Sequence, residues 1–231
     1  FPAIPARQTN RREYRGEAVG LSLAGELSEA GDPALVPFGF ANDPGLLREV
    51  AAIAGEALAI ELSDDQRLRE TLRFLRFSDR EVARAREGYG PSQQGRGIAW
   101  RVAVALFPPS SERILARKEE FARGEGDALA RRVAGSGGIG WLSTKGDYPI
   151  DRVRAGRAFQ RIALAAALHS LAIQPLTSAL ADFPGAGGLR ARLEDLLGLP
   201  PTHTLQMLFR CGYAKPVPPS PRRDVSDLLS A

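Results

Sequence analysis

The chain has 231 residues, of which 44% are hydrophobic and 25% are charged, as in an ordinary globular protein and unlike a long disordered chain. Its 31 basic residues exceed its 27 acidic residues by four, and the two kinds are interleaved through most of the sequence. Aromatic residues make up only 7%. A nucleic-acid-binding protein usually carries a concentrated basic stripe with aromatic side chains, so the composition argues against a nucleic-acid partner.

Cysteine and histidine are scarce. The single cysteine, Cys211, cannot form an internal disulfide, which favours a reducing compartment and a cytoplasmic location. His169 and His203 lie far apart without a metal-binding motif, so no metal site is expected. His169 also interrupts the most apolar stretch, "IALAAALHSLAI", which is too short to span a bilayer, so no membrane partner is expected. Because the chain starts at Phe1 and not at a methionine, we expect a tag, a processed segment or a further domain before it.

The N-terminal part of the sequence predicts a short helix over 22–30 and a strand over 34–40. Pro37 cannot donate a backbone hydrogen bond, so this strand is expected at an edge of the sheet. Asp43 and Pro44 have the residue types of a helix N-cap and first turn. Apolar residues follow at helical spacing and predict a long helix with one buried face.

Polar caps divide the next segment of the chain. Ser63 is expected to cap a helix over 63–77, and Ser78 to cap another helix over 79–87. The stretch "GYGPSQQGRG" (88–97) is rich in glycine and predicts a loop.

Helical patterns return over 98–107, 111–124 and 127–134. The glycine cluster "GSGGIG" (135–140) then matches the G-x-G-x-x-G pattern of dinucleotide-binding loops. That fingerprint requires a strand before it and a helix after it, whereas here a helical segment precedes it and a predicted strand, 139–144, follows. We therefore interpret the cluster as a helix-to-strand turn.

The longest predicted helix covers 151–173, with Asp151 as its cap and His169 as a buried core residue. A shorter helix over 188–198 and a strand over 204–213 follow, and His203 before that strand is expected to be a turn residue.

Together the elements predict one α+β domain over 1–231, with an extended proline-rich tail over 214–231. Its sheet is expected to be small, mixed or antiparallel, and to contain 139–144 and 204–212. The helix over 151–173 is expected to pack at the centre of this sheet.

The N-terminal stretch "ARQTNRREY" (6–14) places Arg7, Thr9 and Arg11 at alternate positions. In an extended backbone these side chains share one face and could hold an anion such as a phosphate. Arg222 and Arg223 offer a second basic pair near the C-terminus. Two solvated basic termini are the alternative, because most arginines are exposed.

Three segments together resemble the FMN-dependent nitroreductase superfamily and, within it, are most similar to the Acg-type oxidoreductases. "RQTNR" matches the R-x-[ST]-x-R motif near the start of that domain. "AGRAFQRIALAAALHSLAIQPLTSAL" (155–180) is similar to the long central helix and the turn after it, and "LFRCGYAKPVPPSPRRDVSDLL" to the closing strand and basic tail. The resemblance covers nearly the whole chain and depends on the order and spacing of these motifs.

The resemblance implies a nitroreductase-like fold that binds FMN, with NAD(P)H as reductant and a nitro-aromatic, quinone or similar electron-poor molecule as acceptor. The FMN phosphate is expected at the two basic ends of the chain, and the flavin ring against backbone groups after the long helix. The residues so assigned are Arg7, Thr9, Arg11, Arg222 and Arg223 for the phosphate, and Pro175, Leu176, Thr177 and Ser178 for the ring. No side chain stands out as a catalytic acid, base or nucleophile.

The superfamily also has a P-S-x-N-x-Q-P-W-type loop that reaches across to the flavin of a partner, and the corresponding stretch here, "SEAGDPALVPFGF", does not contain it. The resemblance therefore implies a homodimer or fusion to an upstream homologous half, as in the internal pseudo-dimers of the Acg type. Two other functions stay open: a flavin-sequestering or degenerate FMN-binding domain without turnover, and a structural half that stabilises a catalytic partner.

Overall fold

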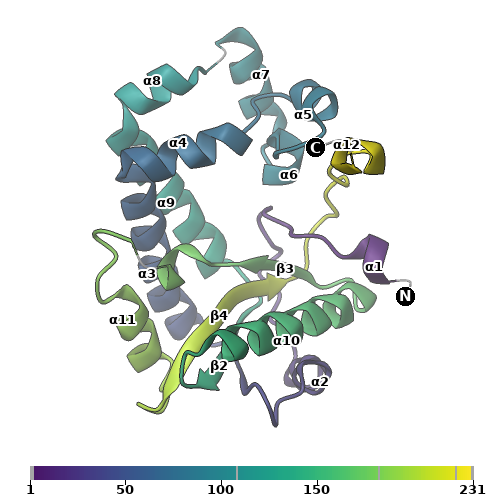
Figure 1. Ribbon diagram of the computed structural model, residues 1–231, viewed down its shortest axis with the longest axis vertical. Coiled ribbons are helices and arrows are strands. Elements are labelled where there is room, and N and C mark those ends of the chain that lie inside the picture. The colour runs from purple at the N-terminus through teal and green to yellow at the C-terminus, as the bar shows by residue number, and fades with distance from the viewer. Residues whose placement is uncertain (1–2, 108, 182, 222, 230–231) are drawn as a thin grey trace.

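A four-stranded antiparallel sheet organises the molecule (Figure 1). The computed structural model describes residues 3–107, 109–181, 183–221 and 223–229. In the order of the sheet, the strands are β1 (Phe38–Ala41), β2 (Gly138–Lys145), β4 (His203–Gly212) and β3 (Ala172–Pro175). In the central pair Gly140 lies opposite Phe209, and at the β3 edge Ile173 lies opposite Cys211.

The helices of the described residues are, in chain order, α1 (Ala3–Ala6), α2 (Leu21–Gly31), α3 (Pro44–Ser63), α4 (Asp65–Phe74), α5 (Asp79–Ala85), α6 (Pro91–Gln94), α7 (Ile98–Leu106), α8 (Ser111–Ala116), α9 (Lys118–Ala134), α10 (Pro149–Leu168), the 3-10 turn η1 (Ser178–Leu180), α11 (Leu189–Leu196) and α12 (Val225–Leu229). None of them is long and apolar enough to cross a membrane.

Apolar side chains cover both faces of the sheet. On one face α2 and α10 pack against Phe209, with Leu27 and Ile162 fully buried there. On the other face α3, α9 and α11 pack against Leu208. Because successive side chains of a strand point to opposite faces, the neighbours Leu208 and Phe209 enter different layers. The predicted α+β architecture, with the long helix packed on an antiparallel sheet, is confirmed.

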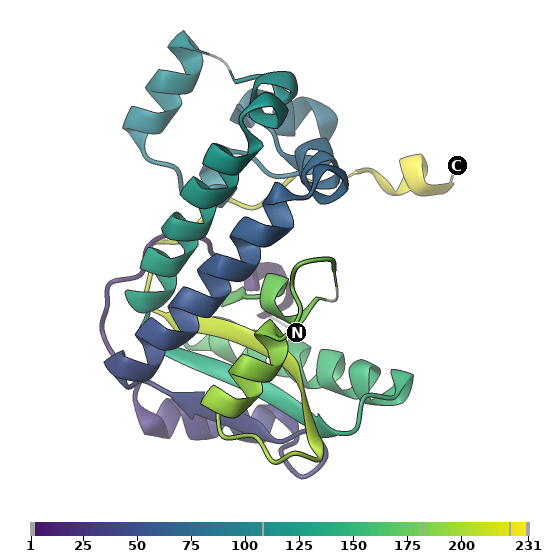
Figure 2. The ribbon, with the colours of Figure 1, turned by 90° about the vertical axis from the view of Figure 1, so that its left-hand side faces the viewer.

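Helices α3 and α9 run side by side away from the sheet and carry α4 to α8 at their far end (Figures 1 and 2). Their backbones approach closely at Gly55 and Gly126. A Cβ atom on Gly126 would lie 2.6 Å from the Gly55 carbonyl oxygen, and one on Gly55 would lie 2.8 Å from the Gly126 carbonyl oxygen. The absence of side chains at these two positions therefore sets the spacing of the pair.

The N-terminal segment lies against both β3 and the start of the C-terminal tail. The Asn10 N–H donates to the Ile173 carbonyl at 3.0 Å, and the Asn10 side chain donates to the Lys215 carbonyl at 2.9 Å. The Arg15 N–H donates to the Tyr213 carbonyl at 2.9 Å. These bonds bring the first and last parts of the chain together at one edge of the sheet.

Several local predictions are confirmed. Asp43 caps α3, since its carboxylate accepts the Leu46 N–H at 2.8 Å, and Ser78 caps α5. The strand predicted over 34–40 lies at a sheet edge as expected, but it is the shorter β1. The cluster 135–140 leads from α9 into β2 and is a helix-to-strand turn.

Other boundaries were wrong. Ser63 ends α3 with its hydroxyl bonded back to the Ala59 carbonyl, and Asp64 caps α4 instead by accepting the Arg67 N–H at 2.9 Å. The predicted loop 88–97 contains the short helix α6. The helical region after residue 110 divides at Arg117, between α8 and α9.

The long helix is displaced from its predicted range. It begins at Pro149, so Asp151 lies inside the first turn, where its carboxylate accepts the Tyr148 N–H at 3.2 Å. It ends at Leu168, and the left-handed backbone of Ser170 (φ 54°) turns the chain into β3. His169 is not a core residue: its side chain is 41% exposed, and its Nε2 lies 3.1 Å from a Glu26 carboxylate oxygen.

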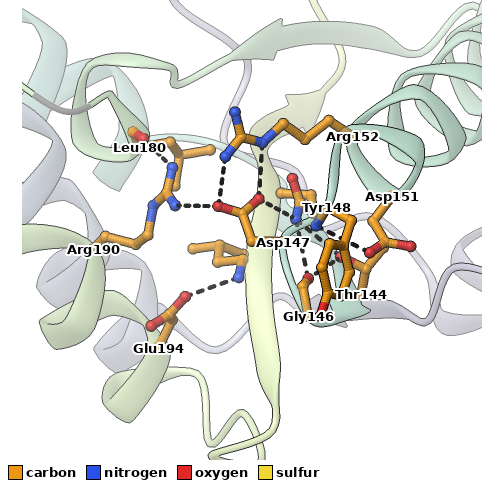
Figure 3. A network of polar contacts seen from close by, with 11 residues as sticks. Thr144, Gly146, Asp147, Tyr148, Asp151, Arg152, Leu180, Arg190 and Glu194 are labelled. Carbon is orange, nitrogen blue, oxygen red and sulfur yellow. Dashed lines mark hydrogen bonds and ion pairs between the residues drawn. The ribbon is translucent and has the colours of Figure 1, made fainter.

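The turn between β2 and α10 is held by the Asp147 carboxylate (Figure 3). It accepts hydrogen bonds from Arg152 Nε and Nη2 at 2.9 and 2.8 Å and from Gln206 Nε2 at 3.0 Å, and Arg190 of α11 lies 3.9 Å away. The two hydrogen bonds from Arg152, more than the one from Gln206, lower the pKa of Asp147 to about 2. The network thus joins the start of α10 to β4 and α11.

Replacing Asp147 by asparagine is expected to lower the free energy of unfolding at pH 7 by about 1 kcal/mol, because the carboxylate is partly exposed and its interactions are screened. Its folded-state pKa lies below the ordinary 3.8, so its contribution is present above about pH 5 and is lost as the pH falls toward 2. Urea unfolding at pH 7 and pH 3 should show the wild type and the variant converging at the lower pH. Asp127→Asn, on the exposed side of α9, is the control, and an equal difference at both pH values would contradict the prediction.

Candidate functional site

A cavity of about 640 Å³ lies between the α3–α9 pair, the segment α4 to α7 and the loop after β3. We refer to it as the large cavity. Its apolar walls include Leu58 of α3, Leu75 after α4, Val104 of α7 and Leu129 of α9. Charged side chains also line it, and these are Arg11, Glu61, Arg96, Glu125 and Arg132.

The loop predicted to edge a flavin, Pro175 to Ser178, lines the large cavity. The Leu176 N–H donates to the Leu208 carbonyl at 2.8 Å, which fixes the loop to β4. Within the described part of the chain, the backbone N–H groups of Thr177 and Ser178 donate to no acceptor. The loop that lines the cavity therefore carries two backbone donors without a partner among the described residues, and this property does not depend on which side chains stand at the two positions.

Arg11 lines the same cavity as this loop, although the two are far apart in the sequence. Its guanidinium carbon lies 5.4 Å from the centre of the Tyr89 ring, a distance typical of a cation–π contact. Burial raises the pKa of Tyr89, so the phenol stays protonated at neutral pH.

Arg7 and Thr9 lie elsewhere. They line a second cavity, of about 520 Å³, with Phe159 of α10 and Tyr213. Thr9 pairs with Ile173 of β3 through an isolated parallel bridge. The Asn10 side chain then accepts the Arg12 N–H at 3.0 Å, so the backbone turns after residue 10, as short polar side chains often cause. The alternation of an extended strand is interrupted there, and the structure does not bring Arg7 and Arg11 to one cavity.

Only one residue of the second basic pair, Arg222 and Arg223, lies within the described part of the chain. Arg223 is exposed in the tail before α12 and lines neither cavity, while its neighbour Asp224 bonds to Arg86. Arg222 lies outside the described residues.

Arg210, for which the sequence predicted no role, is fully buried near the C-terminal end of β4. Its guanidinium donates to the Gln174 side chain at 2.9 Å, to the Arg132 carbonyl at 3.0 Å and to the Arg12 carbonyl at 2.7 Å. Its guanidinium carbon also lies 3.8 Å from the centre of the Tyr14 ring. Burial lowers the pKa of Arg210 to about 10, so it is still a cation at neutral pH.

Arg210 joins three segments that bear candidate site residues: the N-terminal segment, the end of α9 and the end of β3. No pattern in "LFRCGY" predicts this, because a charged residue in a strand is ordinarily assigned to the exposed face. Two of the three acceptors are backbone carbonyls of residues far from Arg210 in the sequence. Only the tertiary structure brings them to its guanidinium group.

The large cavity combines apolar walls, free backbone donors and cationic side chains. Neither histidine lines it, and among the described residues no group of three His, Cys, Asp or Glu side chains could hold a metal ion. This arrangement suits a planar heteroaromatic ligand that carries an anionic group.

Comparisons with known proteins find related sequences and related folds. No protein-family model matches the chain. It is 29% identical over 240 residues to the proteins named "Putative NAD(P)H nitroreductase" of Mycobacterium tuberculosis strains CDC 1551 and H37Rv. The match covers 98% of this chain and 60% of each relative, so the chain spans less than two thirds of the length of these relatives.

Solved structures share its fold at low sequence identity. An FMN- and NADPH-dependent nitroreductase of a Sphigopyxis species has a TM-score of 0.56 at 17% identity, covering 98% of this chain and 96% of that one. A Bacteroides fragilis nitroreductase with bound FMN has a TM-score of 0.55 at 16% identity, with coverages of 97% and 94%. An iodotyrosine deiodinase bound to FMN and 3-iodo-L-tyrosine has a TM-score of 0.56 at 14% identity, with coverages of 97% and 95%. The chain therefore has the nitroreductase-like fold.

Proposed function

We propose that the chain is an FMN-binding domain, extending over 1–231, of an oxidoreductase that takes electrons from NAD(P)H. One observation carries the proposal: Arg11 and the loop Pro175–Ser178, two segments far apart in the sequence that the resemblance assigns to FMN, line the same 640 Å³ cavity. The names of the curated relatives and the FMN-bound and NADPH-dependent neighbours support the same cofactors.

The residues present fit a flavin mononucleotide. The free N–H groups of Thr177 and Ser178 would donate to the polar edge of the ring, and the apolar walls from α3, α7 and α9 would enclose its dimethylbenzene part. Gln94 Nε2 lines the cavity and is buried without a hydrogen-bond partner among the described residues, which leaves a further donor for a ligand. When bound, FMN supplies the hydride and electron transfer, while these side chains bind and orient it and exclude water.

The acceptor that we propose is a small electron-poor molecule such as a nitro-aromatic compound or a quinone. The apolar walls of the large cavity favour a flat, uncharged molecule over a polar one. A flavin-sequestering domain without turnover is the second candidate, because the same apolar walls and backbone donors would also hold a flavin that is not turned over.

We also propose that the site is completed by a second copy of this chain or by a homologous half. The matched relatives are longer than this chain, and α10 exposes apolar side chains at Ile150, Val153 and Leu168, which are 53%, 57% and 66% exposed. Burial of such residues is typical of a dimer interface. A monomer by light scattering that holds FMN stoichiometrically would contradict this proposal.

Arg11→Gln is expected to weaken FMN binding about 10- to 100-fold, since a hydrogen bond to a charged group contributes about 1.5–3 kcal/mol. Flavin titration followed by fluorescence measures the change. Arg123→Gln, which removes an exposed charge from α9 away from the cavity, is the matched control and should bind FMN as the wild type does.

Adding NADPH without oxygen to the loaded protein separates the two candidates. Bleaching of the flavin absorbance indicates an oxidoreductase, and a persistent yellow colour indicates sequestration. Absence of FMN binding by the wild type would contradict both.

A further inference from the structure

A third cavity, of about 630 Å³, adjoins the large one. We refer to it as the arginine cavity. Five side chains line both, so they separate the two spaces, and these are Arg11, Gln94, Arg96, Trp100 and Arg132. A ligand in one cavity can therefore reach the boundary of the other.

The arginine cavity is strongly cationic. Its basic lining residues are Arg11, Arg12, Arg15, Arg96, Arg131, Arg132 and Lys215, whereas the one acidic residue among its lining is Glu13. Arg96 is paired with Glu125. By contrast, no carboxylate of the described residues forms an ion pair with Arg12, Arg131 or Arg132. The Glu125 and Glu13 carboxylates act on Arg132 from beyond ion-pair distance, so the three guanidinium groups have no direct carboxylate partner within this part of the protein.

Two buried donors at this cavity also lack acceptors. Arg12 Nε and Gln94 Nε2 are inaccessible to solvent and make no hydrogen bond among the described residues, although buried polar groups are nearly always paired. A ligand that brings acceptor oxygens to the cavity would pair them. Burial also lowers the pKa of Arg132, and the carboxylates of Glu125 and Glu13 offset this only in part.

Helix polarity alone does not explain this cluster. Arg131 and Arg132 lie in the last turn of α9, where cations are favoured by the helix dipole. Arg12 comes from the N-terminal segment, however, and Lys215 from the tail, so three separate parts of the chain converge on one space. Trp100, at the boundary with the large cavity, adds an aromatic surface beside these charges.

We propose that the arginine cavity binds the phosphate group of a nucleotide ligand, with Arg12 and Arg132 as its principal donors. Guanidinium groups match phosphate oxygens in charge and in geometry, and the cavity is large enough for more than a single inorganic ion. The phosphate belongs either to FMN or to a nicotinamide dinucleotide. Binding of pyrophosphate needs no redox chemistry, so it tests the site separately from the proposed redox function.

Isothermal titration of the full chain with inorganic pyrophosphate tests the site. The double variant Arg12→Gln/Arg132→Gln is expected to bind pyrophosphate at least about 30-fold more weakly than the wild type, as loss of two charge-assisted hydrogen bonds implies. Only side chains change, so the backbone carbonyls that accept from Arg210 are retained. Arg117→Gln/Arg123→Gln removes the same charge from exposed positions outside the cavity and should bind as the wild type does.

A lysine variant and a comparison of cofactors complete the test of the arginine cavity. If the glutamine variant fails to fold by circular dichroism, Arg12→Lys/Arg132→Lys replaces it, and weaker binding by this folded variant supports the site because lysine lacks the planar fork. Selective loss of NADPH over NADH binding assigns the site to the 2′-phosphate, and loss of FMN over riboflavin binding assigns it to the flavin phosphate. No pyrophosphate binding by the wild type, or equal binding by the folded variants, overturns the proposal.

Discussion

Arg210→Met is expected to lower the free energy of unfolding by about 3–5 kcal/mol. The substitution removes the Arg210 donors to the Gln174 side chain and to the Arg12 carbonyl, and each buried acceptor left without a partner costs about 1–3 kcal/mol. The Arg132 carbonyl also loses its bond from Arg210 but still accepts from the Ser136 hydroxyl at 2.8 Å. Methionine fills much of the same volume, so the loss reports on the hydrogen bonds more than on packing. Chemical denaturation of purified protein measures it.

A second variant separates the cation from the planar fork. Arg210→Lys keeps the charge but cannot reach three acceptors from one plane, so we expect about half of the loss caused by methionine. The lowered pKa of Arg210 shows that its burial opposes the charged form. A methionine variant as stable as the wild type would mean that relief of this desolvation outweighs the three hydrogen bonds, which would contradict the prediction.

The sequence predicts those parts of the fold that depend on neighbouring residues. Asp43 and Pro44 mark the start of α3 correctly because a helix N-cap needs only the next few residues. The alternation in the strand that contains Leu208 and Phe209 predicts β4, and its pairing with β2 follows from the presence of a second apolar strand. Errors occur where two adjacent residues can serve as the cap, as with Ser63 and Asp64.

Apolar spacing does not reveal where α10 ends. Leu171 and Ile173 are about as buried as Ile162 and Ala166 of the helix, so the apolar pattern resumes in the strand after only the polar pair His169 and Ser170. The change of backbone occurs at Ser170, whose left-handed conformation is not a preference of serine. The same turn moves His169 from the expected core to the exposed helix end.

The candidate site could be predicted only in part. The resemblance to known motifs identified Arg11 and the loop 175–178, which line the same cavity. The separation of Arg7 from Arg11 depends on the turn after Asn10, whose side chain is held by the Lys215 carbonyl at the other end of the chain. Contacts of this kind, like those of Arg210, join segments that are far apart in the sequence, so no local sequence pattern predicts them.

The spacing of α3 and α9 has consequences for both stability and the large cavity, since both helices contribute to its walls. Gly126→Val is expected to lower the free energy of unfolding by about 3 kcal/mol. Its Cβ would lie 2.6 Å from the Gly55 carbonyl oxygen and 3.0 Å from the Ala59 Cβ, so the two backbones must separate. Overpacking of this kind typically costs about 1–3 kcal/mol, and valine adds two methyl groups beyond the Cβ.

Gly124→Ala, two residues earlier on the same helix, is the matched control. A Cβ atom there meets nothing within 4 Å, so alanine should stabilise the protein by about 0.5–1 kcal/mol through its higher helix propensity. Denaturant unfolding of the two variants should therefore give shifts of opposite sign from one helix. If Gly126→Val were as stable as Gly124→Ala, the helices would not need their close approach, and the walls of the large cavity would tolerate a wider spacing. A destabilised Gly126→Val should also bind FMN more weakly at temperatures where it remains folded, because Ala54 and Leu129 would move apart with their helices.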